Sequence, residues 1–225
     1  MRGSRCNLGC DAVVSLDGAH AFTCPRGGKS QWRHDSIANT LILCAKSAGV
    51  GARPATVADE DSRDHNQSKP DVVLTGILSQ QPVNIDVSAV RVEHANVAAD
   101  VRSRVQLKMR RHREPAHRVG HAFAPFVITG LGGLEQEHAL PLLKDLAKRA
   151  AAHGIDAWVT RQFVPHWLAR FSIVAQRLAG NSLRRHMAAP SQHVSGIGGT
   201  TSAADGGFDA YVRAAGAAAA AKKAF

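Results

Sequence analysis

The sequence has no uninterrupted run of about 18 apolar residues, which is the length that a membrane-spanning helix needs. The Ala-rich segment near the C-terminus is too short, and lies too close to lysines, to serve as one. The N-terminus has no charged start followed by an apolar run, so we expect no secretory signal and an intracellular, reducing location. In that location the four cysteines are expected to be free thiols or metal ligands rather than disulfides.

Acidic residues are scarce relative to basic ones. The 225 residues include 28 Lys and Arg against 18 Asp and Glu, which gives a net charge of +10 before any of the 12 histidines is protonated. Such an excess favours polyanionic partners, because binding to phosphates releases their counterions. A basic protein from an Arg-rich and Ala-rich proteome would have the same balance, so charge indicates a class of partner and not a chemistry.

Composition divides the chain into three parts. Residues 1–28 are rich in Cys and Gly and have too few apolar residues for a core of their own. From residue 190 onward the chain is rich in Gly, Ser and Ala, which is typical of a flexible tail. We therefore expect an N-terminal segment 1–28, a main domain 29–189 and a tail 190–225.

The main domain alternates between helical and strand patterns. Apolar positions predict a helix with Ile37, Leu41 and Cys44 on one stripe, which ends at Gly49 to Gly51. On that stripe Cys44 is expected to be a packed thiol. Most of the polar residues 52–69 are expected to form a surface loop. Next come a hairpin of strands 70–78 and 82–90, a helix over 96–113 and a strand over 122–130. A further helix contains Leu142, Leu143, Leu146 and Ala150 and ends at Gly154. The last element is a helical region 156–187 that is interrupted or kinked by Pro165. This order predicts an α/β fold, a small mixed sheet covered by helices.

Two aspartates occupy the predicted hairpin. Asp71 begins the first strand and Asp86 lies within the second, with 14 residues between them. If the hairpin tip lies near Leu78 and Ser79, the two residues are directly opposed, with Cβ atoms roughly 4.5–5.5 Å apart. Two carboxylates at that distance repel unless a proton or a cation lies between them, and Mg²⁺ suits carboxylates combined with water and phosphate. Two separate solvent-facing aspartates are the alternative, but a lone charge at Asp86, among valines and isoleucine, is costly.

Lys108 lies on the apolar stripe of the helix that follows. It stands three residues after Val105 and seven after Val101. An inward lysine beside the sheet can reach a phosphate or an attacking water. In the alternative, its stem packs on the helix while its ammonium escapes to solvent.

The N-terminal segment offers a complete zinc shell. Three thiolates and one imidazole within 19 residues supply the four ligands of a structural Zn²⁺ site: Cys6, Cys10, His20 and Cys24. Glycines allow tight turns around a metal, and a segment so poor in apolar residues needs a metal to order it. The alternative is four unpaired polar residues in a disordered leader.

Taken in order, these motifs resemble the restriction-like endonuclease domain, of the PD-(D/E)xK class, at the C-terminal end of site-specific non-LTR retrotransposon polyproteins. The resemblance covers roughly residues 5–187. It is carried by the Cys-Cys-His-Cys knuckle, Arg33-His34-Asp35, Lys69-Pro70-Asp71-Val72, Asp86, Phe123-Ala124-Pro125-Phe126-Val127 with Gly130, and Gln176-Arg177 with Gly180-Asn181.

The resemblance implies that Asp71 and Asp86 bind Mg²⁺, with Lys108 as the catalytic lysine. In the parent pattern a lysine stands two residues after the second acid, where this chain has Ser88. The family commonly supplies the lysine from the following helix instead, and His112 replaces a tyrosine that often follows it. Asp35 is expected to support the site, and Glu60 is a further candidate for a third acid. The expected nucleic-acid contacts are Arg33, His34, Lys69, Arg110, Arg111 and Arg113.

We therefore expect a nuclear, Mg²⁺-dependent DNA endonuclease with a structural Zn²⁺, which nicks target DNA so that the free 3′ end primes reverse transcription. Its partners would be DNA and the element's RNA, and not membranes. Because no reverse transcriptase precedes Met1, we expect a fragment or decayed copy of a longer polyprotein. One alternative is a nucleic-acid-binding module without catalysis, which is favoured by the departures from the family pattern at Ser88 and His112. The other is a purely structural zinc protein.

Overall fold

The computed structural model describes residues 4–5, 13–14, 29–61, 69–77, 81–90, 96–154 and 156–187. By its contacts the chain divides into two units, Met1–Ala189 and Pro190–Phe225. The proposed zinc ligands and the predicted tail lie outside the described residues, so those predictions stay as they are. In the N-terminal segment only a short antiparallel pair is described, β1 (Ser4–Arg5) with β2 (Val13–Val14).

Helix α2 (Lys29–Ser47) confirms the first helical prediction. Ile37, Leu41 and Cys44 are all buried on its inner face. The helix ends in a left-handed residue, Gly49, with φ of 72°. The amides of Gly49 and Val50 then bond back to the carbonyls of residues 46 and 45, which is the Schellman arrangement that a C-terminal glycine favours.

Four strands form one mixed sheet. They are β3 (Gly51–Pro54), β4 (Val72–Thr75), β5 (Val83–Val90) and β6 (Ala122–Thr129), in that spatial order. The first three are antiparallel neighbours, and β6 pairs with β5 in parallel. The predicted hairpin, the strand at 122–130 and the mixed α/β sheet flanked by helices are therefore confirmed.

The interpretation of residues 52–69 as a loop was wrong in its first part. Residues 51–54 form the strand β3, and a 3₁₀ turn, η2 (Val57–Asp59), follows it. An edge strand exposes most of its side chains, so a polar sequence with a proline is compatible with it. Arg53 then donates to Asp59 at 2.7 Å, which ties the strand to the turn. Residues 62–68 lie outside the described part of the chain.

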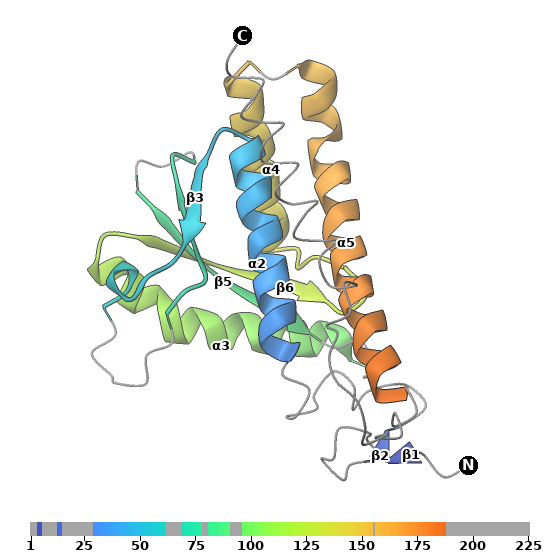
Figure 1. Cartoon of the computed structure of the whole chain (residues 1–225). Helices are drawn as coiled ribbons and strands as arrows, with labels where there is room; N and C mark the ends of the chain where they lie inside the picture. The colour runs from blue at the N-terminus through green and yellow to red at the C-terminus, as the bar shows by residue number, and fades with distance from the viewer. Residues whose placement is uncertain are drawn as a thin grey trace, which may run out of the picture. The chain divides into compact units, whose positions relative to one another are not determined.

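Helices cover both faces of the sheet (Figure 1). One face packs against α3 (Val97–Arg118), and the other against α2, α4 (Ala139–Ala152) and α5 (Ala157–Met187). Strand β5 serves both layers, because alternate residues point to opposite sides. Ile85 and Val87 enter the large core, whereas Val90 packs with Val105 of α3, so Asp86 shares the α3 side.

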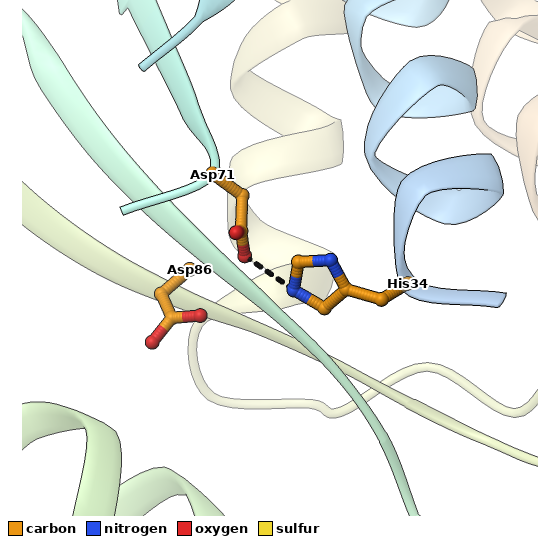
Figure 2. A group of neighbouring side chains, drawn as sticks. All are labelled: His34, Asp71 and Asp86. Atoms are coloured by element: carbon orange, nitrogen blue, oxygen red, sulfur yellow. Dashed lines mark ion pairs between the residues drawn. The ribbon is translucent and has the colours of Figure 1, made fainter. Parts of the chain in front are cut away.

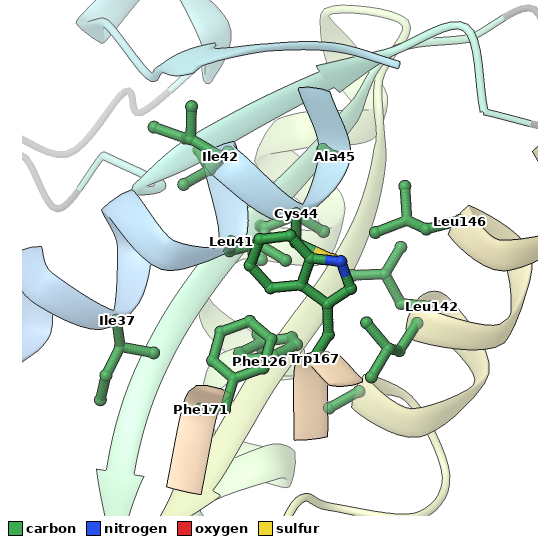
Figure 3. Packing of buried hydrophobic residues seen from close by; sticks show 14 of the residues in the cluster. Ile37, Leu41, Ile42, Cys44, Ala45, Phe126, Leu142, Leu146, Trp167 and Phe171 are labelled. Atoms are coloured by element: carbon green, nitrogen blue, oxygen red, sulfur yellow. The ribbon is translucent and has the colours of Figure 1, made fainter. Parts of the chain in front are cut away.

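The large core lies between the sheet and the three helices. Figure 3 shows the rings of Trp167 and Phe171 among apolar side chains of α2 and α4. Phe171 also packs on Phe126 of β6, with ring centroids 5.0 Å apart. The predicted interruption at Pro165 is not seen, since α5 runs continuously through it. We attribute this to the buried aromatic side chains on either side of an exposed proline, whose packing outweighs one lost hydrogen bond.

Helix α4 carries the predicted apolar positions at 142, 143, 146 and 150, all buried, and is followed by Gly154 with φ of 74°. No helix in the described residues combines the length and the apolar character that crossing a membrane requires.

Candidate metal centre

Asp71 lies immediately before β4, across from Asp86 of β5. The pairs Val72 with Ile85 and Val73 with Asn84 set the register, and one step further places Asp71 opposite Asp86. The side chain of Asp71 reaches over to β5, where its Oδ2 accepts the Val87 amide at 2.6 Å. The carboxylate thus replaces a strand carbonyl as acceptor, which holds Asp71 against β5 beside Asp86.

A histidine completes a cluster of possible ligands. His34, Asp71 and Asp86 each offer one ligand atom, and these atoms all lie within 4.8 Å of one another. Figure 2 shows His34 extending from α2 towards Asp71. The Nε2 atom of His34 lies 2.8 Å from Oδ2 of Asp71. Among the described residues, this is the one group of three or more such side chains found close enough to hold a metal ion.

Two side chains from α3 bind the carboxylate of Asp86. Lys108 Nζ lies 2.6 Å from it, and His112 Nε2 lies 2.8 Å from Oδ2. The two residues are four apart, so they project from the same face of the helix. The side chain of Lys108 is only 18% exposed and its ammonium is paired with Asp86, so the alternative in which the ammonium escapes to solvent is wrong.

His112 also reaches Glu60, which follows η2. Its Nδ1 lies 2.9 Å from both carboxylate oxygens of Glu60. The His112 side chain is 2% exposed, and both of its ring nitrogens face a carboxylate. Burial lowers the pKa of His112, but the hydrogen bonds to Asp86 and Glu60 and the charges of these two residues outweigh burial and raise the pKa to about 9. The ring is therefore an imidazolium at neutral pH, and Glu60 reaches Asp86 through it rather than directly.

The two aspartates have opposite pKa shifts. Burial raises the pKa of Asp71, and the nearby Asp86 raises it further, against the opposing effect of His34. Burial acts on Asp86 too, but the hydrogen bond from His112 and the charge of Lys108 outweigh it and lower the pKa to about 2. Asp86 is therefore firmly anionic, and Asp71 is the carboxylate whose charge would gain most from an added cation.

Asp35 does not join the three possible ligands. Its side chain is 53% exposed, and its Oδ1 accepts from Gln31 at 2.8 Å and lies 3.5 Å from Nδ1 of His34. It therefore lies behind His34, on the side away from Asp71. His34 turns towards Asp71, and the contact with nucleic acid that we expected of it stays a prediction.

A sequence signal for both histidines existed. His34 stands three residues before Ile37 and seven before Leu41, on the buried stripe of α2. His112 stands seven residues after Val105 and four after Lys108, on the inner stripe of α3. Helical periodicity alone would have placed both rings on inward faces.

The expected nucleic-acid contacts on α3 are exposed, and two of them line a cleft. Arg110, Arg111 and Arg113 all face solvent. The cleft, of about 770 Å³, lies along the second half of α3 and is lined by Gln81, Met109, Arg110, Arg113, Glu114, His117, His121, Ala122 and Phe123. Phe123 stacks on His112 with ring centroids 5.4 Å apart, so the cleft adjoins the buried network around Asp86.

The other sequence candidates have less specific surroundings. Lys69 is exposed, with Nζ 3.3 Å from the carbonyl of Ala55. Arg33 is partly buried. Ser88 is buried two positions after Asp86, where the parent pattern has lysine.

Comparison with known proteins adds no relative. The chain matches no protein-family model and no curated protein sequence. The side chains around Asp71 and Asp86 therefore carry the functional argument by themselves.

Proposed function

We propose that this chain is a metal-dependent DNA endonuclease of the restriction-like kind, part of a longer reverse transcriptase polyprotein, which nicks target DNA for retrotransposon insertion in the nucleus. The observation that carries the proposal is the convergence of Asp71, Asp86 and Lys108, from two adjacent strands and the helix over them, at one point. Acid, acid and lysine in this order are the residues that such nucleases use.

The residues present fit a divalent cation. Each carboxylate oxygen has two lone pairs, so Asp86 can accept from Lys108 and His112 and still bind an ion. The hydrogen bonds from Val87 and His34 fall on Oδ2 of Asp71, and the carboxyl of Asp71 is also hydrogen bonded to that of Asp86, so a cation would replace the proton between the two acids. Burial is the main cause of the raised pKa of Asp71, so its ionised carboxylate lacks the solvation that a bound cation would replace. A cation held here would polarise a phosphodiester and supply a water of lowered pKa.

The chain's own side chains would orient the substrate and balance its charge. Lys108 places an ammonium beside the carboxylate of Asp86, where a bound phosphodiester would meet a second positive charge. His112, which is itself held by Glu60, binds Asp86 from the same helix, so that the carboxylate of Asp86 stays fixed. Arg110 and Arg113 line the adjoining cleft, where guanidinium groups can bind backbone phosphates.

Zinc bound by Cys6, Cys10, His20 and Cys24 would add a second DNA contact. These residues lie outside the described part of the chain, and the zinc knuckle is part of the proposal.

One observation favours a second candidate, a nucleic-acid-binding module that no longer cleaves. Lys108 and His112 already neutralise Asp86, and an ion-pair network of this kind is stable without a metal. The basic cleft and the net charge of +10 serve binding equally well. Binding that weakens steeply with salt, without cleavage in any divalent metal, would identify this candidate.

Nicking of supercoiled plasmid, with Mg²⁺ or Mn²⁺ as the added ion, separates the two. The wild type should nick, Asp71→Ala should not, and both should bind DNA within about threefold of each other, because phosphate contacts and not the acids dominate affinity. Asp145→Asn is the matched control, since Asp145 pairs with Lys148 on α4 outside the site. Nicking by Asp71→Ala at the wild-type rate would defeat the proposal, and binding without nicking by the wild type would leave the second candidate.

A further inference from the structure

His34 is held on the inner side of α2. Its side chain is 27% exposed, on the stripe that continues to Ile37 and Leu41. From there Nε2 reaches Asp71, 2.8 Å from Oδ2, at the point where β4 begins (Figure 2). An imidazole nitrogen therefore lies at the edge of the space that both carboxylates adjoin.

The spacing of the three side chains is close to that of ligands around one ion. Two ligand atoms at about 2.1 Å from an ion and at right angles are about 3.0 Å apart, and two on opposite sides are about 4.2 Å apart. The separation of His34 Nε2 from Asp71 Oδ2 is 2.8 Å, and the widest spacing in the group is at most 4.8 Å. The three ligand atoms therefore lie close enough together to surround one ion after small side-chain movements.

The other nitrogen of His34 faces a carboxylate. Nδ1 lies 3.5 Å from Oδ1 of Asp35, and Gln31 donates to that same oxygen at 2.8 Å. Metal-binding histidines commonly direct their second nitrogen to a carboxylate, which fixes the ring and the tautomer. The contact is long, but it lies on the correct side of the ring. Asp35 would thus be a positioning residue for His34.

Nitrogen in the shell changes which ion the site prefers. Mg²⁺ prefers oxygen ligands and keeps several waters, whereas imidazole suits divalent transition metals. We propose that His34 is a direct ligand of the cation held by Asp71 and Asp86, and that this nitrogen makes the site select Mn²⁺ over Mg²⁺. The inference rests on the part of the proposed function that places a cation between the two aspartates, and it does not depend on cleavage.

The competing arrangement uses the same residues differently. His34 could donate only a hydrogen bond to Asp71 while an ion is bound by carboxylate oxygens alone. Electron spin-echo spectroscopy of bound Mn²⁺ distinguishes the two, because a directly bonded nitrogen couples to the metal's unpaired electrons. A calorimetric titration with Mn²⁺ and with Mg²⁺ gives the affinities.

The full chain is first given one equivalent of Zn²⁺, which the three thiolates of the N-terminal segment bind in preference to one imidazole and two carboxylates, and it should then show one Mn²⁺ with nitrogen coupling. His34→Ala should lose the coupling and bind Mn²⁺ about 10-fold more weakly or worse, with Mg²⁺ affinity within about threefold of wild type. His34→Asp, which restores an oxygen ligand, should bring the two affinities closer together and covers the case in which the alanine variant fails to fold. His166→Ala, an exposed histidine of α5, is the control and should behave as wild type.

Mn²⁺ bound by the wild type without nitrogen coupling, or with equal affinity in His34→Ala, would overturn the inference. No Mn²⁺ binding by the wild type would overturn it together with the cation of the proposed function. Nitrogen coupling without nicking would contradict the nuclease alone, so the two failures are distinguishable.

Discussion

His112 should make the stability of the protein fall as the pH rises above neutrality. Its ring is buried between Asp86 and Glu60, which raise the pKa of His112 from 6.5 to about 9 against the effect of burial. A folded-state pKa above the unfolded value contributes stability that is fully present below pH 6.5 and is lost as the pH rises through about 9. The folded state is therefore favoured by protonation, and alkali removes that contribution.

The magnitude follows from the shift. A change from 6.5 to about 9 corresponds to about 3 kcal/mol in the free energy of unfolding. Linkage places about 2 kcal/mol of that loss between pH 6.5 and about pH 8.5. This range lies below the pH at which the buried Cys44 contributes, since the pKa of its thiol is raised by burial and its unfolded value is 9.0.

Urea unfolding followed by circular dichroism, without added divalent cation, measures the effect. The wild type is compared with His112→Gln, which keeps polar contacts but cannot carry the charge. His34, whose pKa is also raised, adds a slope of the same sign to both proteins, so the difference between the two curves isolates His112. That difference should shrink by about 2 kcal/mol over the range. A difference that stays constant with pH would refute the buried imidazolium.

Three further predictions concern the scaffold. Gly132→Ala should lower the free energy of unfolding in urea by about 2 kcal/mol or more, because φ is 92° and the new Cβ would overlap the backbone of Ser172. Gly180→Ala, in an open helical position, should raise that free energy by about 1 kcal/mol. Peptide mass spectrometry after iodoacetamide should find Cys44 unmodified in the native protein, since burial raises the pKa of its thiol, and rapid native labelling would contradict this. Glu135→Ala should lower the free energy of unfolding by about 2 kcal/mol, because its carboxylate accepts three backbone amides at the start of α4, and an unchanged urea midpoint would show that this cap is dispensable.

The pairing of Asp71 with Asp86 could be predicted from the sequence because it depends on local order. Two strands with a short link have few possible registers, and a tip near residues 78 and 79 gives the register observed between Val72 and Ile85. Lys108 could be placed for the same reason, since three-to-four residue spacing from Val105 fixes its side of the helix. The sequence-based predictions were correct for positions that are fixed within a single helix or hairpin.

His34 and His112 show what local patterns leave out. Periodicity places each ring on an inward face, but it does not say what the ring meets there. That His34 reaches Asp71 depends on where α2 crosses the start of β4, and that His112 reaches Glu60 depends on the path of η2. Both are tertiary facts. The sequence therefore did not show that His34, expected to contact nucleic acid, binds Asp71, or that His112, a departure from the family pattern, binds Asp86.

Strand β3 was missed because its composition is that of a loop. Only one side of a short edge strand is paired among the described residues, and most of its side chains are exposed, so neither alternation nor apolar content marks it. The buried acids that follow, Asp59 and Glu60, were hidden by the same polar surroundings. Their burial is explained by their partners. Asp59 binds Arg53 on the strand before it, and Glu60 binds His112, which is distant in sequence.

The central claim is that one divalent cation is shared by Asp71 and Asp86. Anomalous diffraction from crystals of the protein soaked in Mn²⁺ would locate the ion directly. The account predicts a strong peak within about 2.3 Å of an oxygen from each of the two carboxylates. Density that leaves this position vacant, with Lys108 and His112 alone neutralising Asp86, would contradict it.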